Sequence, residues 1–206
     1  MTAPPRRTQD QRRAETRRRL LDATIECVAE LGYSGATTRR IAERAEVSVG
    51  AVTHHFQYRV DLVAAAVEEL VRRRLVALRQ ALDALPDDRA QRVRATLDLL
   101  WGDFSGPLFT VMVKLWIAAG DEEELYERMV PLERLLARAA ANLQGDLGLD
   151  VDTAEGGKGM RVNPRYAVVV STLRGLALSR AFEPRAGQVR DPWPAYRAEL
   201  ERYLLS

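Results

Sequence analysis

Apolar residues recur along this chain at intervals of three and four positions, the spacing that places them on one face of an α-helix. The clearest stripe is Val67, Val71, Leu75, Leu78 and Leu82. It predicts a long helix over about 60–84, with Pro86 beyond its end. Further helices are expected at about 89–101, 107–119, 122–144, 164–182 and 192–205, and only the short run 166–170 also fits a strand. We therefore predict an all-α fold.

The N-terminal segment predicts one long helix followed by two short ones. Thr8 and Gln11 have the spacing of a capping box, which places the start of the first helix at Thr8, and Gly32 is a natural stop. A short helix follows the pair Thr37-Thr38. After a break at residues 46–47, Ser48 can cap a second short helix that runs to about Phe56.

Two very short helices joined by a tight turn and supported by a longer first helix are typical of a helix-turn-helix. Ala42 is small enough to lie where the short helices cross, and Val47, Val52 and Phe56 can anchor the second one. Gly50 costs about 1 kcal/mol relative to alanine inside a helix. Either a close approach of DNA or a frayed short helix explains it. We predict an N-terminal arm and DNA-binding domain at 1–58 and a separate helical C-terminal domain at 59–206.

Charge is distributed unevenly along the chain. Residues 1–82 hold fifteen arginines and ten acidic residues, whereas the whole chain has a net charge of only +2. This bias fits a module that faces nucleic acid, or a solvated helix end. The single cysteine, Cys27, excludes an intramolecular disulfide and fits a reducing compartment. With no targeting or membrane segment in view, we expect a cytoplasmic protein.

Other functional classes find little support. The chain shows no phosphate-binding glycine loop, no metal-ligand spacing and no nucleophile–histidine set, so we expect no enzyme, cofactor or metal. His54 and His55 are adjacent, and adjacent helix residues point about 100° apart rather than converging on a metal. The basic first helix could alternatively lie on an anionic membrane, but its arginines precede its apolar stripe instead of flanking it.

The segment 32–59 resembles the DNA-binding domain of the TetR (tetracycline-repressor) family. The matching positions are Gly32-Tyr33, Thr37-Thr38, Ile41-Ala42, Val47-Ser48, Gly50, His55-Phe56 and Arg59. Two positions depart from the family pattern. Glu46 stands in the turn where the family usually has glycine, and a left-handed backbone there costs on the order of 1 kcal/mol. Thr53 replaces a tyrosine that reaches a phosphate in relatives, so this contact is shorter or lost.

The resemblance implies which residues contact DNA. Thr38, Thr53, His55 and Arg59 would lie along phosphates, and Arg39, Val49, Gly50, Ala51 and His54 near base edges, with Ser48 at the helix start. Arg59 begins the long helix, where a bound phosphate would meet both the arginine and free N–H groups. Arg39 could pair with guanine. A solvated side chain remains the alternative for both arginines.

Aromatic and methionine residues gather in the middle of the chain. They are Trp101, Phe104, Phe109, Met112, Val113, Trp116, Tyr126 and Met129. Such residues line apolar ligand pockets, but they also build ordinary helical cores. The resemblance implies a cavity here for a small apolar or amphipathic effector. Lys114 could meet an anionic ligand group, pair with the acidic residues 122–124, or extend to water.

A helix-turn-helix of this size normally works as a dimer on a pseudo-palindrome. The helices at 122–144 and 164–182 are the predicted dimer surface. Its expected residues are Leu132, Leu136, Ala139, Leu143, Leu173, Leu176, Ala177 and Arg180. We expect a homodimeric repressor that binds a double-stranded DNA operator and is released by the effector. The alternative is a regulator of the same type that activates transcription or takes no effector.

Overall fold

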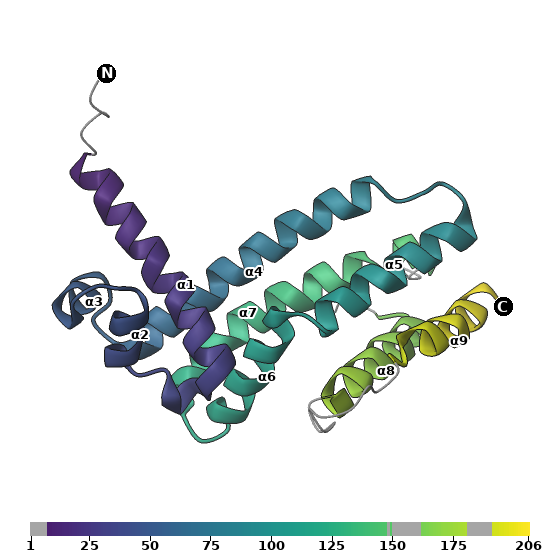
Figure 1. The fold of residues 1–206 in the computed structure, drawn as a ribbon. Helices are drawn as coiled ribbons and strands as arrows, with labels where there is room; N and C mark the ends of the chain where they lie inside the picture. Colours follow the sequence, from purple (N-terminus) through teal and green to yellow (C-terminus); the bar gives the residue numbers. More distant parts are fainter. Residues whose placement is uncertain (1–7, 148, 150–161, 181–190) are drawn as a thin grey trace, which may run out of the picture. The chain divides into compact units, whose positions relative to one another are not determined.

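The computed structural model describes residues 8–147, 149, 162–180 and 191–206. Over these ranges the chain forms nine α-helices and one short 3-10 helix, without any strand, which confirms the all-α prediction (Figure 1). The elements are α1 (Gln9–Gly35), α2 (Thr38–Arg44), α3 (Val49–His55), α4 (Arg59–Asp83), α5 (Arg89–Phe104), α6 (Pro107–Ala119), α7 (Glu123–Asn142), η1 (Gly145–Leu147), α8 (Pro164–Arg180) and α9 (Trp193–Leu205). The strand alternative for 166–170 is wrong, because this run lies inside α8.

Local sequence signals account for the helix ends. The Thr8–Gln11 capping box is present at the start of α1, and Gly32 interrupts this helix with φ 73°. Pro107 and Pro164 are the first residues of α6 and α8, and Pro192 is the N-cap residue of α9. The segment 145–163, between the helices predicted at 122–144 and 164–182, begins with η1, and most of its remainder lies outside the described residues. Among the helices that can be described, none is both long and apolar enough to cross a membrane.

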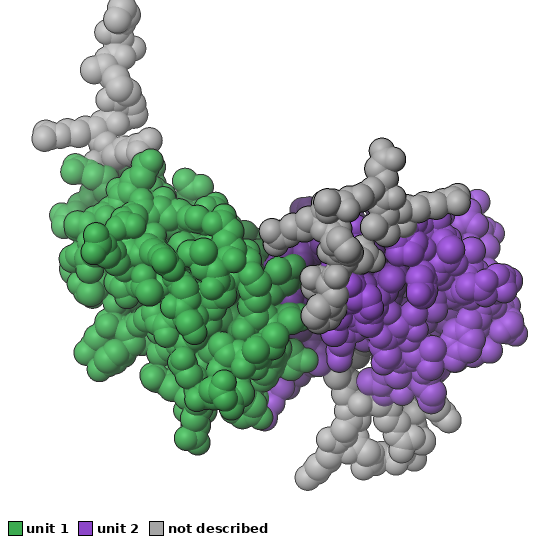
Figure 2. All heavy atoms as spheres, turned by 60° about the horizontal axis from the view of Figure 1, so that its bottom comes forward, with its two compact units in different colours: residues 1–73, 110–133 green, residues 74–109, 134–206 purple. Residues whose placement is uncertain are grey.

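The helices group into two compact units (Figure 2). Unit 1 contains residues Met1–Arg73 and Thr110–Glu133, and unit 2 contains Arg74–Phe109 and Arg134–Ser206. The helices α4, α6 and α7 each contribute to both units. The division at residue 58 was drawn by expected function rather than by contacts, and it stays a prediction.

Unit 1 packs the three N-terminal helices with the first half of α4 and parts of α6 and α7. Leu20, Ile41 and Val52, from α1, α2 and α3, are all buried. Polar contacts reinforce this core. The ammonium of Lys114 in α6 donates to the backbone carbonyl of Ala29 near the end of α1. None of the three roles expected for Lys114 is therefore what the structure shows: it binds a helix C-terminus, where a cation is favourable.

Unit 2 is arranged around α5, which contacts η1, α8 and α9. The indole rings of Trp101 and Trp193 stack with centroids 5.1 Å apart, and Leu97 and Leu173 are buried beside them in one apolar core. This core gives α9, at the end of the chain, a defined place against α5.

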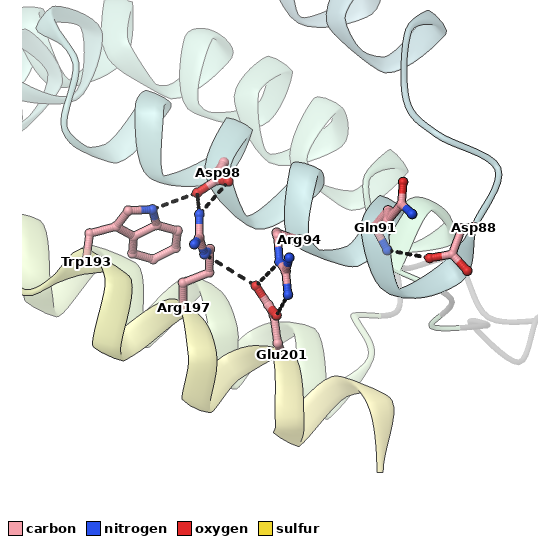
Figure 3. A network of polar contacts seen from close by, with 7 residues as sticks. All are labelled: Asp88, Gln91, Arg94, Asp98, Trp193, Arg197 and Glu201. Atoms are coloured by element: carbon pink, nitrogen blue, oxygen red, sulfur yellow. Dashed lines mark hydrogen bonds and ion pairs between the residues drawn. The ribbon is translucent and has the colours of Figure 1, made fainter.

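A network of charged groups joins α5 to α9 on the edge of this core (Figure 3). The Asp98 carboxylate accepts hydrogen bonds from Trp193 Nε1 at 2.7 Å and from the Arg197 guanidinium at 2.9 Å. Arg197 also reaches Glu201, which accepts two hydrogen bonds of 2.9 Å from Arg94. These bonds orient α9 more specifically than apolar packing alone.

Candidate DNA-binding site

The helix-turn-helix of unit 1 is formed by α2 and α3, with α1 as its support (Figure 1). Both short helices are capped, α3 by Ser48 as predicted and α2 by Thr37. Thr37 Oγ1 accepts the N–H of Arg40 at 3.3 Å, and Ser48 Oγ accepts the N–H of Ala51 at 3.1 Å. Such caps contribute about 1 kcal/mol each, which matters in helices of only seven residues.

The turn between the two helices contains the residue that departs from the family pattern. Glu46 has φ 52°, in the left-handed region, and it is the one non-glycine residue with positive φ that the described chain contains. The next residue, Val47, donates its N–H to the Ala42 carbonyl at 3.0 Å. Ala42 is buried at the crossing, as its small size predicted. The left-handed backbone expected at Glu46 is therefore present.

A partner from α1 holds this turn. The Arg19 guanidinium donates to the Glu46 carboxylate at 2.9 Å and to the Glu46 backbone carbonyl at 3.3 Å. The two residues are 27 positions apart, so nothing in the local pattern indicated the contact.

One face of α3 packs inward and the other is open to solvent. Val52 is buried, and Val47 and Phe56 are half-buried, so the three expected anchors hold the helix in place. On the outer face Gly50, Thr53 and His54 are exposed and the Val49 side chain is 47% exposed, while Ala51 and His55 are half-buried. An apolar valine held outward on an anchored helix is available for contact with another molecule.

Gly50 has no packing requirement within the chain. A Cβ added there would meet only the Ser48 hydroxyl, at 3.9 Å, which is an ordinary contact. The internal structure therefore gives no reason for glycine at this position, and the explanation by close approach of a partner stays open. The Thr53 hydroxyl donates to the Gly50 carbonyl at 3.1 Å. The Thr53 hydroxyl oxygen can still accept a hydrogen bond from another group.

The candidate contacts on α2 lie beside α3. Thr38 is half-buried at the first position of α2, and Arg39 is exposed. Arg39 donates to Glu43 one turn later at 3.0 Å, and both side chains are largely open to water. Exposed pairs of this kind contribute little, so a base edge or phosphate could replace Glu43.

Arg59 at the start of α4 is bound within the chain. Its guanidinium lies 3.8 Å from the centre of the Tyr33 ring and donates to the Tyr33 backbone carbonyl at 2.6 Å. The Tyr33 hydroxyl is in turn hydrogen-bonded to Glu122; burial, the largest cause, raises the pKa of this phenol. The structure thus gives Arg59 a structural partner that the sequence did not reveal, and its phosphate contact stays a prediction.

His54 and His55 end α3 with ring centroids 5.7 Å apart. No group of three or more candidate metal ligands occurs in the part of the chain that the structure describes. Burial, then His54, and then Arg13 and Arg17 lower the pKa of His55. His55 therefore favours its neutral form at pH 7 in the absence of a bound anion.

The eight residues expected to line an effector cavity are divided between the two units. Trp101, Phe104 and Phe109 belong to unit 2, and the other five to unit 1. Within each unit they form edge-to-face pairs: Phe104 with Phe109 at 5.2 Å, and Trp116 with Tyr126 at 5.9 Å. Met112 and Met129 are buried, whereas Tyr126 is exposed. A common cavity remains a prediction.

Several residues expected at the dimer surface are buried within the chain instead. Leu143, Leu173 and Leu176 belong to the core of unit 2, and Ala177 is packed against that core. Leu132 is also buried, Leu136 and Ala139 are half-buried, and Arg180 is exposed beside the Trp101 ring, at 5.6 Å. The buried leucines are occupied by contacts in their own chain, so a second copy needs other side chains.

Comparison with known proteins finds relatives of the N-terminal segment that contains the helix-turn-helix. Residues 20–66 match the family described as "Bacterial regulatory proteins, tetR family". An uncharacterized HTH-type transcriptional regulator of Mycobacterium tuberculosis is 53% identical over 51 residues, which is 25% of this chain and 26% of that protein. The Escherichia coli regulator BetI is 49% identical over 41 residues, or 20% of this chain and 21% of its own length. The chain thus matches about a quarter of these relatives or less.

Solved structures extend the likeness over most of the chain. A transcriptional regulator from Rhodococcus sp. Rha1 has 27% identity and a TM-score of 0.59, with 91% of each chain covered. This structure is thus similar to the chain both in the helix-turn-helix and in the helices that follow it. Residues 20–66 therefore carry the match to the tetR family of bacterial regulatory proteins, and the rest of the chain is similar to a solved regulator in fold.

Proposed function

We propose that this chain binds duplex DNA as a homodimer and represses transcription by occluding a promoter in the cytoplasm. The observation that carries the proposal is the outer face of α3, where Val49, Gly50, Thr53 and His54 are exposed on a helix that Ser48 caps and Val52 anchors. An α-helix presented in this way fits the major groove of B-form DNA. Ala51 and His55 lie at the edge of the same face, and Thr38, Arg39 and Arg59 would contact DNA beside it.

A second copy of the chain would supply the second recognition helix. Because the leucines of α8 are buried, we propose that the dimer surface uses apolar side chains that remain exposed in unit 2: Val168 of α8, and Tyr196 and Tyr203 of α9. Closed dimers bury self-complementary surfaces of this kind. Two heads related by a two-fold axis would read a pseudo-palindrome with half-sites about one helical turn, ~34 Å, or more apart.

A small apolar or amphipathic effector would release the dimer from DNA. Support comes from the aromatic and methionine residues of the two units and from fold relatives whose structures hold ligands. One is the regulator FadR of Bacillus subtilis in complex with stearoyl-CoA, with a TM-score of 0.64 and 16% identity over 92% of this chain and 97% of that one. An effector that favours the non-binding conformation by about 1–3 kcal/mol is sufficient to change operator occupancy.

The DNA part of this proposal is tested by selecting bound sequences from a random duplex library. The full chain is expected to enrich a pseudo-palindromic sequence. Val49→Glu places a carboxylate on the outer face of α3 and should abolish the enrichment by repelling phosphates. Val76→Glu is the matched control, because Val76 is similarly exposed (51%) but lies in α4 within unit 2.

The possible outcomes test recognition through α3 and the homodimer separately. Enrichment by the wild type and the Val76→Glu variant, with loss in Val49→Glu, supports recognition through α3. Enrichment that survives Val49→Glu would contradict the assigned face. Selection of a single unpaired half-site, together with a monomeric mass by light scattering, would contradict the homodimer.

A further inference from the structure

We infer that the first eleven residues of α1 form a second DNA-binding element, in which Arg13 and Arg17 bind backbone phosphates beside the groove that α3 enters. We call residues 9–19 the α1 arm. This inference rests on the proposed DNA-binding function and deepens it, since it names a contact surface outside the helix-turn-helix. No residue of the arm was among the expected DNA contacts.

The α1 arm is an ordered helix that the core of the protein does not require. The capping box fixes its start: Thr8 Oγ1 accepts the Gln11 N–H at 3.2 Å, and the Gln11 side chain accepts the Thr8 N–H at 2.9 Å. No residue from 9 to 19 is buried, and burial begins only at Leu20. A capped helix of three turns without a buried residue presents most of its surface to solvent, where another molecule can contact it.

The arm is strongly basic. Its eleven residues include five arginines against two acidic residues, Asp10 and Glu15. The five arginines do not have equal roles. Arg19, at the end of the arm, is bound to Glu46, whereas Arg13, Arg17 and Arg18 are exposed. This local excess of positive charge attracts a polyanion.

Two of these arginines lie beside the recognition helix. Arg13 and Arg17 are four residues apart and therefore share one face of α1. The Arg17 guanidinium lies 5.5 Å from the centre of the Phe56 ring, directly after α3. Both arginines are close enough to His55 to contribute to its lowered pKa, after burial and His54. The arm thus extends the surface at the end of α3 along α1 with positively charged side chains. At a rise of 1.5 Å per residue, Arg13 lies about 6 Å beyond Arg17 along the helix axis.

Duplex DNA fits this surface better than an anionic membrane does. A helix that lies in a membrane interface needs an apolar face of residues such as Leu, Phe or Trp. The arm offers only Ala14. Guanidinium groups on a regular face suit a row of phosphates, which they neutralise with release of counterions.

The test compares three variants with the same net charge in the full chain: Arg13→Gln, Arg17→Gln and Arg18→Gln. Arg18 is the matched control, because it is exposed on the same arm but points about 100° away from Arg17. Glutamine preserves helix propensity, which far-UV circular dichroism verifies. Binding to a random-sequence duplex of about 30 base pairs, roughly three helical turns, is measured by fluorescence anisotropy over a range of salt concentrations.

Arg13→Gln and Arg17→Gln should each lower the slope of log K against log salt by about 0.9, with roughly five-fold weaker binding at physiological salt, and Arg18→Gln should change neither. Equal losses in all three variants, or no loss in any, would overturn the assignment while leaving the proposed function intact. Failure of the wild type to bind duplex DNA at low salt would instead remove the proposed function. Binding to phosphatidylserine vesicles that exceeds DNA binding and is lost in the same two variants would replace DNA with a membrane.

Discussion

Arg19 and Glu46 meet across 27 positions of sequence, and their contact holds the turn of the helix-turn-helix. The arginine donates both to the carboxylate and to the backbone carbonyl of the residue with φ 52°. A left-handed backbone costs a residue with a Cβ on the order of 1 kcal/mol. The pair therefore combines a local strain with a long-range bond that offsets part of it.

Arg19→Ala is expected to lower the free energy of unfolding by about 0.5–1 kcal/mol, because the pair is partly exposed to water. In a Glu46→Gly background the same change should cost little, because glycine removes the carboxylate that Arg19 binds and adopts the left-handed turn without strain. Urea unfolding of the four proteins in this double-mutant cycle measures the coupling. An equal cost of Arg19→Ala in both backgrounds would show that the turn does not depend on this bond.

Arg59 is expected to have both a structural and a DNA-binding role, and two substitutions separate them. Arg59→Ala should lower the free energy of unfolding by about 1–2 kcal/mol, because it removes the Tyr33 ring contact and the hydrogen bond to the Tyr33 carbonyl. It should also lower the salt slope of DNA binding by about one. Arg59→Lys should restore most of the slope but little of the stability, since an ammonium does not stack as a guanidinium does. If Arg59→Ala keeps the wild-type salt slope of DNA binding, the phosphate contact is contradicted.

Asp98 is predicted to be the most sensitive member of the network in Figure 3, because it accepts hydrogen bonds from both Trp193 and Arg197. Asp98→Asn should lower the free energy of unfolding by about 1–3 kcal/mol and shift the tryptophan fluorescence. Glu199→Gln is the control, since it removes only the exposed pair with Arg202 on the same helix. Similar costs for the two substitutions would mean that the network adds nothing beyond surface charge.

Glu69 should make the protein lose stability in acid. Hydrogen bonds from Arg72 and then Arg73 lower the pKa of its carboxyl from 4.5 to about 2. A carboxylate with a lowered pKa stabilises the folded state above its ordinary pKa, and this contribution disappears as the pH falls from 4.5 to about 2. We expect about 1 kcal/mol, because both arginines are partly exposed. Glu69→Gln should flatten this part of the pH profile of urea unfolding, and Glu68→Gln should leave it as it is.

The helical fold and the helix-turn-helix could be predicted because their signals are local. Thr8, Thr37 and Ser48 each cap a helix through a residue three positions later, so the spacing itself contains the information. The stripes of apolar residues gave helix bounds to within a few positions. The resemblance to the TetR family came from residues of one short segment, where order and spacing are fixed by the same packing.

The contacts that complete the site could not be predicted in this way. The bonds from Arg19 to Glu46, Arg59 to Tyr33 and Lys114 to Ala29 join positions 26 to 85 residues apart. Apolar periodicity also does not show what covers a helix face. For this reason Leu173 and Leu176 were assigned to a partner although they pack in their own chain. The members of the aromatic cluster belong to two units, so their assignment to one cavity stays a prediction.

Unit 1 is not a continuous stretch of chain, and this affects how the protein can be dissected. A fragment that ends at residue 58 would lack Val60, Leu62 and Val63, which are buried in unit 1, and the Arg59 partner of Tyr33. It would also lack Lys114, which binds the end of α1. A fragment of residues 1–58 would thus expose apolar side chains of unit 1 that the missing residues cover. Studies of DNA binding therefore need the whole of unit 1.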